Sequence, residues 1–217
     1  MPQRLHPAPG VFFANVEDDT VVLDLNTDGY FCLVGLAGHL QIAPDRALRA
    51  AETDVLDFLI QSGLAATGDT GRGAGARRLP RPMRTSRSHQ VPDPTLREFS
   101  EFLRSTAHAA VAFPKRRVSR LIGAEDDRPA PRPRCDADLV RRAVLFDRWL
   151  PWIPFQGQCL YRAYTLRRYL RLAGLDACWV FGVRTWPFAA HCWLQVEDLI
   201  LDDDLDRVRL YTPILFA

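Results

Sequence analysis

The chain has 217 residues, of which 47% are hydrophobic and 25% are charged. This composition is ordinary for a globular protein and is sufficient for a substantial core. No apolar run reaches the length of about 18 residues that a membrane-spanning helix needs. The first residues also lack the apolar stretch of a secretion signal. We therefore expect a cytoplasmic protein with no membrane partner.

Charge is distributed unevenly along the chain. Residues 1–71 contain three arginines and ten acidic residues, whereas residues 72–148 contain eighteen basic and nine acidic residues. Residues 149–217 contain seven of each, and all five tryptophans lie at or after Trp149. Such shifts indicate separate pieces with different roles.

The first piece combines short strands with helices. Apolar and β-branched residues predict strands in 11–16, 21–25 and 30–33, with a turn at Thr27-Asp28-Gly29 between the last two. A short helix is expected from Pro44 through Ala50, followed by a helix that Thr53 caps and Gly63 ends. Three strands followed by small helices predict a winged-helix-like module over residues 1–66.

Residues 67–92 have a different composition. They are rich in Gly, Pro, Ser and Arg and contain almost no large apolar residues, which predicts a flexible basic linker. Aromatic residues for base stacking are not interleaved with the arginines. A solvated tether is therefore favoured over a nucleic-acid-binding patch, and no nucleic-acid partner is expected.

Residues 93–217 are predicted to form an α+β domain in which helices precede an antiparallel sheet. Helical periodicity is clear in residues 95–113 and 137–150, and a loop is expected over 123–136. A further helix begins near Cys159 and ends at Gly174. Three β-rich segments follow, at 177–183, 190–196 and 199–204.

The five cysteines are odd in number and scattered, without a CxxC pair, so neither a disulfide framework nor a zinc site is indicated. The histidines are also dispersed, and we expect no metal or other cofactor. Most free cysteines are buried as small hydrophobic residues. Cys159 differs because it lies at a predicted helix N-terminus, where backbone N–H groups and the helix dipole lower the pKa of a thiol.

One histidine and a run of acids follow Cys159 in the order that thiol-based acyl transfer requires. His191 opens a predicted strand, and the hairpin that follows would bring either Asp203 or Asp204 opposite it, depending on register. Gln156 and Gln158 are candidate donors to the oxyanion of a tetrahedral intermediate.

Two other cysteines are weaker candidates for the nucleophile. Cys178 lies in an apolar strand, and Cys192 adjoins His191, so its side chain is expected on the opposite face of the strand. Neither has the helix-terminus setting of Cys159.

The segments CLYRAYTLRRYLRLAGLDA, VFGVRTWPFAAHCWLQV and LILDDD resemble the lasso-peptide leader peptidases, or B proteins, of the transglutaminase-like cysteine protease group. The resemblance implies that Cys159 is the nucleophile, His191 the base and Asp203 the third member of a triad. The run of three aspartates, Asp202 to Asp204, departs from the family pattern, because it leaves open which of them is the third member of the triad.

The segment VVLDLNTDGYFCL resembles strands of the PqqD-like module that recognises the leaders of ribosomally made peptides. Together the two resemblances imply the fused form of the B protein. The leader would bind as an added strand beside a module strand, with a helix as the other wall. The implied contact residues are Gly29, Tyr30, Phe31, Cys32 and Leu33 on the strand and Val55 and Leu59 on the helix.

The implied function is hydrolysis of the leader–core peptide bond of a precursor peptide, which frees the core N-terminus for a separate asparagine-synthetase-like, ATP-dependent cyclase. The same triad would also suit a transglutaminase-type acyltransferase, in which an amine replaces water. A non-catalytic peptide-binding scaffold is the third reading.

Overall fold

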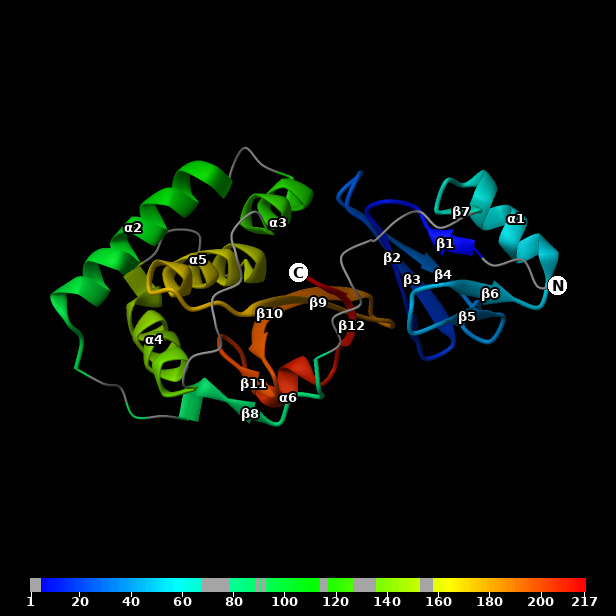
Figure 1. Ribbon diagram of the computed structural model, residues 1–217. Coiled ribbons are helices and arrows are strands. Elements are labelled where there is room, and N and C mark those ends of the chain that lie inside the picture. Colours follow the sequence, from blue (N-terminus) through cyan, green and yellow to red (C-terminus); the bar gives the residue numbers. More distant parts are fainter. Residues whose placement is uncertain are drawn as a thin grey trace.

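A computed structural model describes residues 5–67, 79–88, 90, 93–113, 117–126, 136–152 and 158–217. The strands of the N-terminal part lie at one end of the molecule, and a larger sheet with its helices lies at the other (Figure 1). In the described part of the chain, no helix is long and apolar enough to cross a membrane.

The N-terminal part contains an antiparallel sheet of three strands, β2 (Val11–Val16), β3 (Asp19–Asp24) and β4 (Gly29–Leu33), in the order β2-β3-β4. The predicted meander is therefore confirmed. The Asp24 carboxylate holds the turn between β3 and β4, because it accepts hydrogen bonds from the Asn26 backbone N–H and the Thr27 hydroxyl. This leaves β4 at the edge of the sheet.

The winged-helix-like arrangement is not confirmed. Residues 5–67 contain one helix, α1 (Thr53–Gln61), and a second small sheet with the order β5-β6-β1-β7. Its strands are β1 (Leu5–Pro7), β5 (Leu40–Ile42), β6 (Leu48–Ala50) and β7 (Ala65–Thr67).

The helix expected from Pro44 through Ala50 is wrong, because the chain turns there and pairs β5 with β6. Leu40 and Leu48 are fully buried, one on each strand, and the pairing of Ile42 with Leu48 keeps the backbone extended. The helix expected at Thr53 is present and ends before Gly63, whose φ is +71°. Its N-terminal flanking residue is Glu52, which makes no side-chain capping bond, so the expected Thr53 cap is absent.

The C-terminal part contains a five-stranded sheet with the order β12-β9-β10-β11-β8. All of its pairings are antiparallel except that of β8 with β11. The strands are β8 (Arg84–Thr85), β9 (Cys178–Arg184), β10 (Ala189–Val196), β11 (Leu199–Ile200) and β12 (Thr212–Phe216). The predicted α+β class with an antiparallel sheet is confirmed for this part, although β12 was not predicted.

Helices gather on one side of this sheet (Figure 1). They are α2 (Leu96–Ala112), α3 (Val118–Asp126), α4 (Asp136–Trp149) and α5 (Cys159–Leu172), and the short α6 (Leu205–Val208) lies near β11. A capping box between Thr95 and Glu98 starts α2. The loop expected over 123–136 is wrong at its two ends, which belong to α3 and α4, and its centre lies outside the described residues.

Part of the segment that is expected to be a flexible linker forms regular structure. Residues 84–85 form β8, and the next three residues, Ser86–Ser88, form a turn of 3-10 helix. The Ser86 hydroxyl is buried and donates to the Leu201 carbonyl at 2.6 Å. Residues 68–78 lie outside the described part of the chain.

One hydrophobic cluster contains residues of both parts of the molecule. Val21 and Leu23 of β3 face the C-terminal part and join the same buried cluster as Leu166 of α5 and Phe181 of β9. Val22, between them in sequence, faces the other way into the cluster around α1. The three-stranded sheet is therefore covered on both faces, as the complete burial of β3 requires.

Comparing two C-terminal fragments tests whether β8 belongs to the catalytic half. A fragment of residues 79–217 retains β8 and the Ser86 bond, whereas a fragment of residues 93–217 loses both. We expect the longer fragment to melt at a temperature several degrees higher, because unpaired buried groups cost about 1–3 kcal/mol each. Circular dichroism during heating measures the difference. Equal melting temperatures would show that residues 79–88 behave as a tether.

Candidate active site

Cys159 is the first residue of α5, and Gln158 before it has extended backbone. The helix is held firmly, because Tyr164, Leu166, Tyr169 and Leu170 are almost completely buried. Its N-terminal N–H groups favour negative charge on the Cys159 sulfur. The Gln158 side chain is exposed and makes no capping bond, and Gln156 lies outside the described residues.

His191 lies near the start of β10, where the strand passes the N-terminus of α5. Its Nε2 hydrogen-bonds Oδ2 of Asp203, and both side chains are buried. The remaining nitrogen, Nδ1, is therefore left for Cys159, with which the imidazole also forms a hydrogen bond. The ring packs beside Tyr211, with a distance of 5.2 Å between ring centroids.

The charges of this group reinforce one another. Hydrogen bonds from Cys192 and then from His191 lower the pKa of Cys159 to about 4, although burial opposes the shift. Burial lowers the pKa of His191, but its hydrogen bonds to Asp203 and Cys159 outweigh that effect and raise the pKa to about 9. Between these values the pair is a thiolate and an imidazolium, which is the reactive state of a cysteine nucleophile.

The three consecutive aspartates have different partners. The Asp202 carboxylate is buried and accepts the Leu194 backbone N–H at 2.8 Å. Asp203 contacts His191, and Asp204 is exposed and pairs with Arg87 at 2.5 Å. Continuing the hairpin register of β10 and β11 would place Asp204 opposite His191, but regular pairing of these strands ends at Ile200. The chain then bends, and this bend brings Asp203 to the imidazole.

The segment that was expected to be a linker fixes this bend. The Thr85 hydroxyl donates to the Asp203 carbonyl at 2.9 Å, and the Ser86 hydroxyl donates to that of Leu201. The Arg87 guanidinium forms an ion pair with the Asp204 carboxylate. The sequence does not reveal these positions, because a strand of two residues has no local hydrophobic pattern. Its hydrogen-bond partners are more than 110 residues away.

Cys192 is closer to the site than the sequence indicated. The expected alternation holds, because Cys192 joins the core cluster that includes α5. Since α5 lies on that same face, however, the thiol and backbone N–H of Cys192 both hydrogen-bond the Cys159 sulfur. Burial raises the pKa of Cys192 well above its usual value, so the thiol keeps its proton. Cys178 is buried in the separate cluster on the other face of the sheet.

The residues expected to bind a leader fall into distinct environments. Gly29–Leu33 form the edge strand β4, whose Tyr30 and Cys32 face the C-terminal part while Leu33 faces the α1 side. Phe31 is 45% exposed, and Val55 is partly buried. The Leu59 side chain is completely buried in the core of the N-terminal part, and its role as a peptide contact remains a prediction.

Tyr30 approaches the cysteine site. Its ring lies 5.9 Å from that of Phe188 between centroids, and burial together with the nearby sulfurs of Cys192 and Cys159 raises its pKa. Tyr30, Cys159 and His191 line one open cavity of about 150 Å³. The N-terminal part therefore forms one side of the site.

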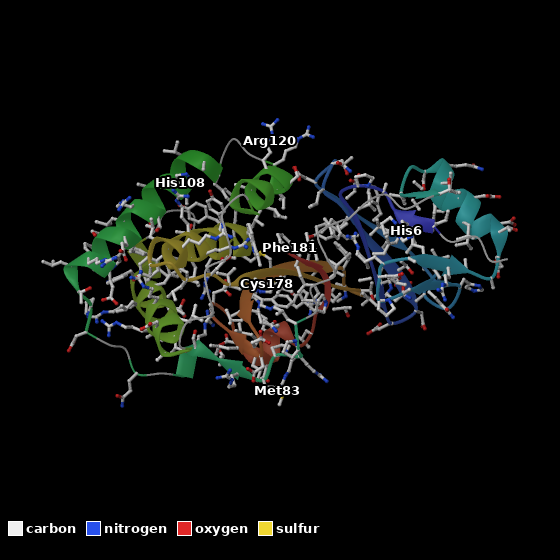
Figure 2. The ribbon with its side chains drawn as sticks, in the orientation of Figure 1. His6, Met83, His108, Arg120, Cys178 and Phe181 are labelled. Carbon is white, nitrogen blue, oxygen red and sulfur yellow. The ribbon has the colours of Figure 1, made fainter. Side chains whose placement is uncertain are left out.

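No group of His, Cys, Asp and Glu among the described residues is arranged to hold a metal ion. The other histidines that the structure describes lie elsewhere. His6 is in β1 and His108 in α2, both remote from Phe181 at the centre of the molecule (Figure 2). His39 pairs with Glu52 at the surface.

A matched pair of cysteine variants tests the contribution of Cys192. Cys192→Ala removes the thiol that donates to the Cys159 sulfur, so the thiolate is less stabilised and the pKa of Cys159 rises from about 4. The rate of iodoacetamide alkylation of Cys159, followed against pH, should then reach its half-maximum at higher pH. Cys178→Ala, which removes an equally buried thiol on the other face of the sheet, should leave the profile unchanged. Coincident profiles for Cys192→Ala and the wild type would contradict the contact.

Comparison with known proteins places the C-terminal part in a family. The model of the transglutaminase-like superfamily matches residues 102–216, more than half of the chain. The microcin J25-processing protein McjB of Escherichia coli is 41% identical over 49 residues, which cover 23% of this chain and 24% of that protein. No solved structure matches. The chain is a member of the transglutaminase-like superfamily.

Proposed function

We propose that this protein is a cysteine peptidase of lasso-peptide biosynthesis that cuts the leader from a ribosomally made precursor peptide. The observation that carries the proposal is the buried contact of His191 with Asp203 beside a helix-terminal cysteine of lowered pKa. The likeness to a microcin-processing protein supports the choice of a precursor peptide as substrate.

In the proposed reaction, the Cys159 thiolate attacks the carbonyl carbon of the leader–core bond. In this scheme, backbone N–H groups at the start of α5 stabilise the resulting oxyanion. The His191 imidazolium gives its proton to the departing amine of the core, and a thioester to the leader remains. His191 then takes a proton from water as the water oxygen attacks the thioester carbonyl. The carbon–sulfur bond breaks, the leader leaves with a free carboxylate, and the thiolate and imidazolium are restored.

Asp203 positions the imidazole in this scheme. By accepting from Nε2 it directs Nδ1 toward Cys159, and its negative charge stabilises the imidazolium. The edge strand β4 is the proposed site for the leader, added as a further strand. The released core would pass to an asparagine-synthetase-like cyclase.

Incubation with candidate precursor peptides, followed by mass spectrometry of the products, tests the reaction. Hydrolysis yields a leader with a free carboxylate. Transfer to an amine, the activity for which the superfamily is named, yields a leader amide whose mass differs from that of the hydrolysed leader by the mass of the amine less one water. Cys159→Ala should abolish cleavage and leave leader binding close to that of the wild type. Cleavage by this variant at more than a trace would refute the assignment of the nucleophile.

The aspartate run supplies its own comparison. Asp203→Asn removes the charge that stabilises the imidazolium, so the pKa of His191 falls from about 9. Activity should drop by orders of magnitude, and the alkaline limb of the remaining pH profile should move to lower pH. Asp204→Asn, at the exposed neighbour, should retain most of the activity. A larger loss at Asp204 would contradict the proposed role of Asp203.

A further inference from the structure

The open cavity beside Cys159 is built from both parts of the molecule. Its N-terminal side consists of Leu23 of β3, Leu25 in the turn that follows, and Tyr30 of β4. Its other apolar walls are Val118 of α3, Leu160 of α5 and Phe181 of β9. Phe181 is labelled near the centre of the molecule, where the sheet approaches the N-terminal strands (Figure 2). Cys159 and His191 lie in the same lining, so any group held in the cavity is next to the reacting sulfur.

The walls suit an apolar occupant. Aliphatic and aromatic side chains form most of the lining, and the Asp28 carboxylate is already engaged with the Val118 backbone N–H at 3.2 Å. A carboxylate in the cavity would face both Asp28 and the negatively charged sulfur of Cys159. The described lining contains no lysine or arginine, and the charge of His191 is already paired with Asp203 and with the Cys159 thiolate.

The volume fits a single side chain. A cavity of about 150 Å³ lined by apolar residues is large enough to bind benzene, and the cavity here is of that size. A phenyl ring or a branched aliphatic side chain would therefore fit it.

We propose that this cavity is the subsite for one apolar side chain of the peptide substrate, next to the scissile bond, and that Leu23, Leu25 and Tyr30 of the N-terminal part determine its specificity. The inference rests on the proposed peptidase function. It gives the N-terminal part a role in selecting the residue at the cut as well as in holding the leader.

Alkylating reagents of graded size test the subsite without a known substrate. Each reagent is attacked by the Cys159 thiolate, a carbon–sulfur bond forms and iodide leaves. The set is iodoacetamide and its N-benzyl, N-naphthylmethyl, N-carboxymethyl and N-aminoethyl derivatives, with rates at Cys159 followed by peptide mass spectrometry and normalised to glutathione. Burial of the phenyl ring should make the benzyl reagent react at least about tenfold faster than iodoacetamide.

Two leucine variants of the full chain then locate the specificity. Leu25→Ala enlarges the cavity and should shift the preference from the benzyl to the naphthylmethyl reagent severalfold. Leu56→Ala truncates an equally buried leucine of the same part that does not line the cavity, and should keep the wild-type preference. If Leu25→Ala fails to fold, Ala190→Leu narrows the cavity from an exposed position and should reduce the benzyl preference instead.

The outcomes separate this inference from the proposed function. A reactive Cys159 with no benzyl preference, or with a preference for the amine reagent, overturns the apolar subsite and leaves the peptidase in place. An unchanged preference in a folded Leu25→Ala or Ala190→Leu variant overturns the role of the cavity walls. A Cys159 that resists every reagent below the usual pKa of a thiol overturns both proposals.

Discussion

The packing of α5 against β10 is the constraint on which the site depends. Cys159 and His191 come from elements that β9 separates in the chain, and they meet because the helix packs against β10. Leu166 and Leu170 of the helix and Leu194 of the strand are fully buried in one cluster, which fixes the crossing. A nucleophile and base assembled this way gain their geometry from core packing rather than from a flexible loop.

Support for the third member of the triad comes from outside the hairpin. The aspartates leave the sheet after Ile200, so strand pairing no longer determines where their side chains point. Thr85, Ser86 and Arg87 each hold one point of the bend, by two hydroxyl bonds to carbonyl groups and one ion pair. Asp202 adds a bond to the backbone of β10. The position of Asp203 beside the His191 imidazole is therefore fixed by several hydrogen bonds and an ion pair from separate segments of the chain.

Much of this arrangement was predictable from the sequence, and the failures share a physical cause. Helix α5 and strands β9 and β10 have strong local patterns, so the placement of Cys159 and His191 at their ends followed from periodicity. Hairpin register could not choose between Asp203 and Asp204, because the choice depends on a bend stabilised by distant residues. Strand β8 could not be predicted from the sequence for the same reason. Gly, Pro and Arg dominate the surrounding residues, and its two residues form a strand because they pair with the distant β11. Likewise, β5 and β6 have only three residues each, too few for the alternation of apolar and polar residues that indicates a strand.

The double burial of β3 has an evolutionary consequence. Val21 and Val22 are adjacent and both fully buried, yet they belong to different cores. Among relatives, the residue at Val21 should covary with positions in the catalytic half, whereas the residue at Val22 should covary with positions such as Leu59 in the N-terminal part. Drift in the two halves is thus coupled through this six-residue strand. Recombination that exchanged the N-terminal part between homologues would have to preserve the positions of β3 that face the catalytic half, such as Val21. The alternate positions, such as Val22, could change together with the rest of the exchanged part.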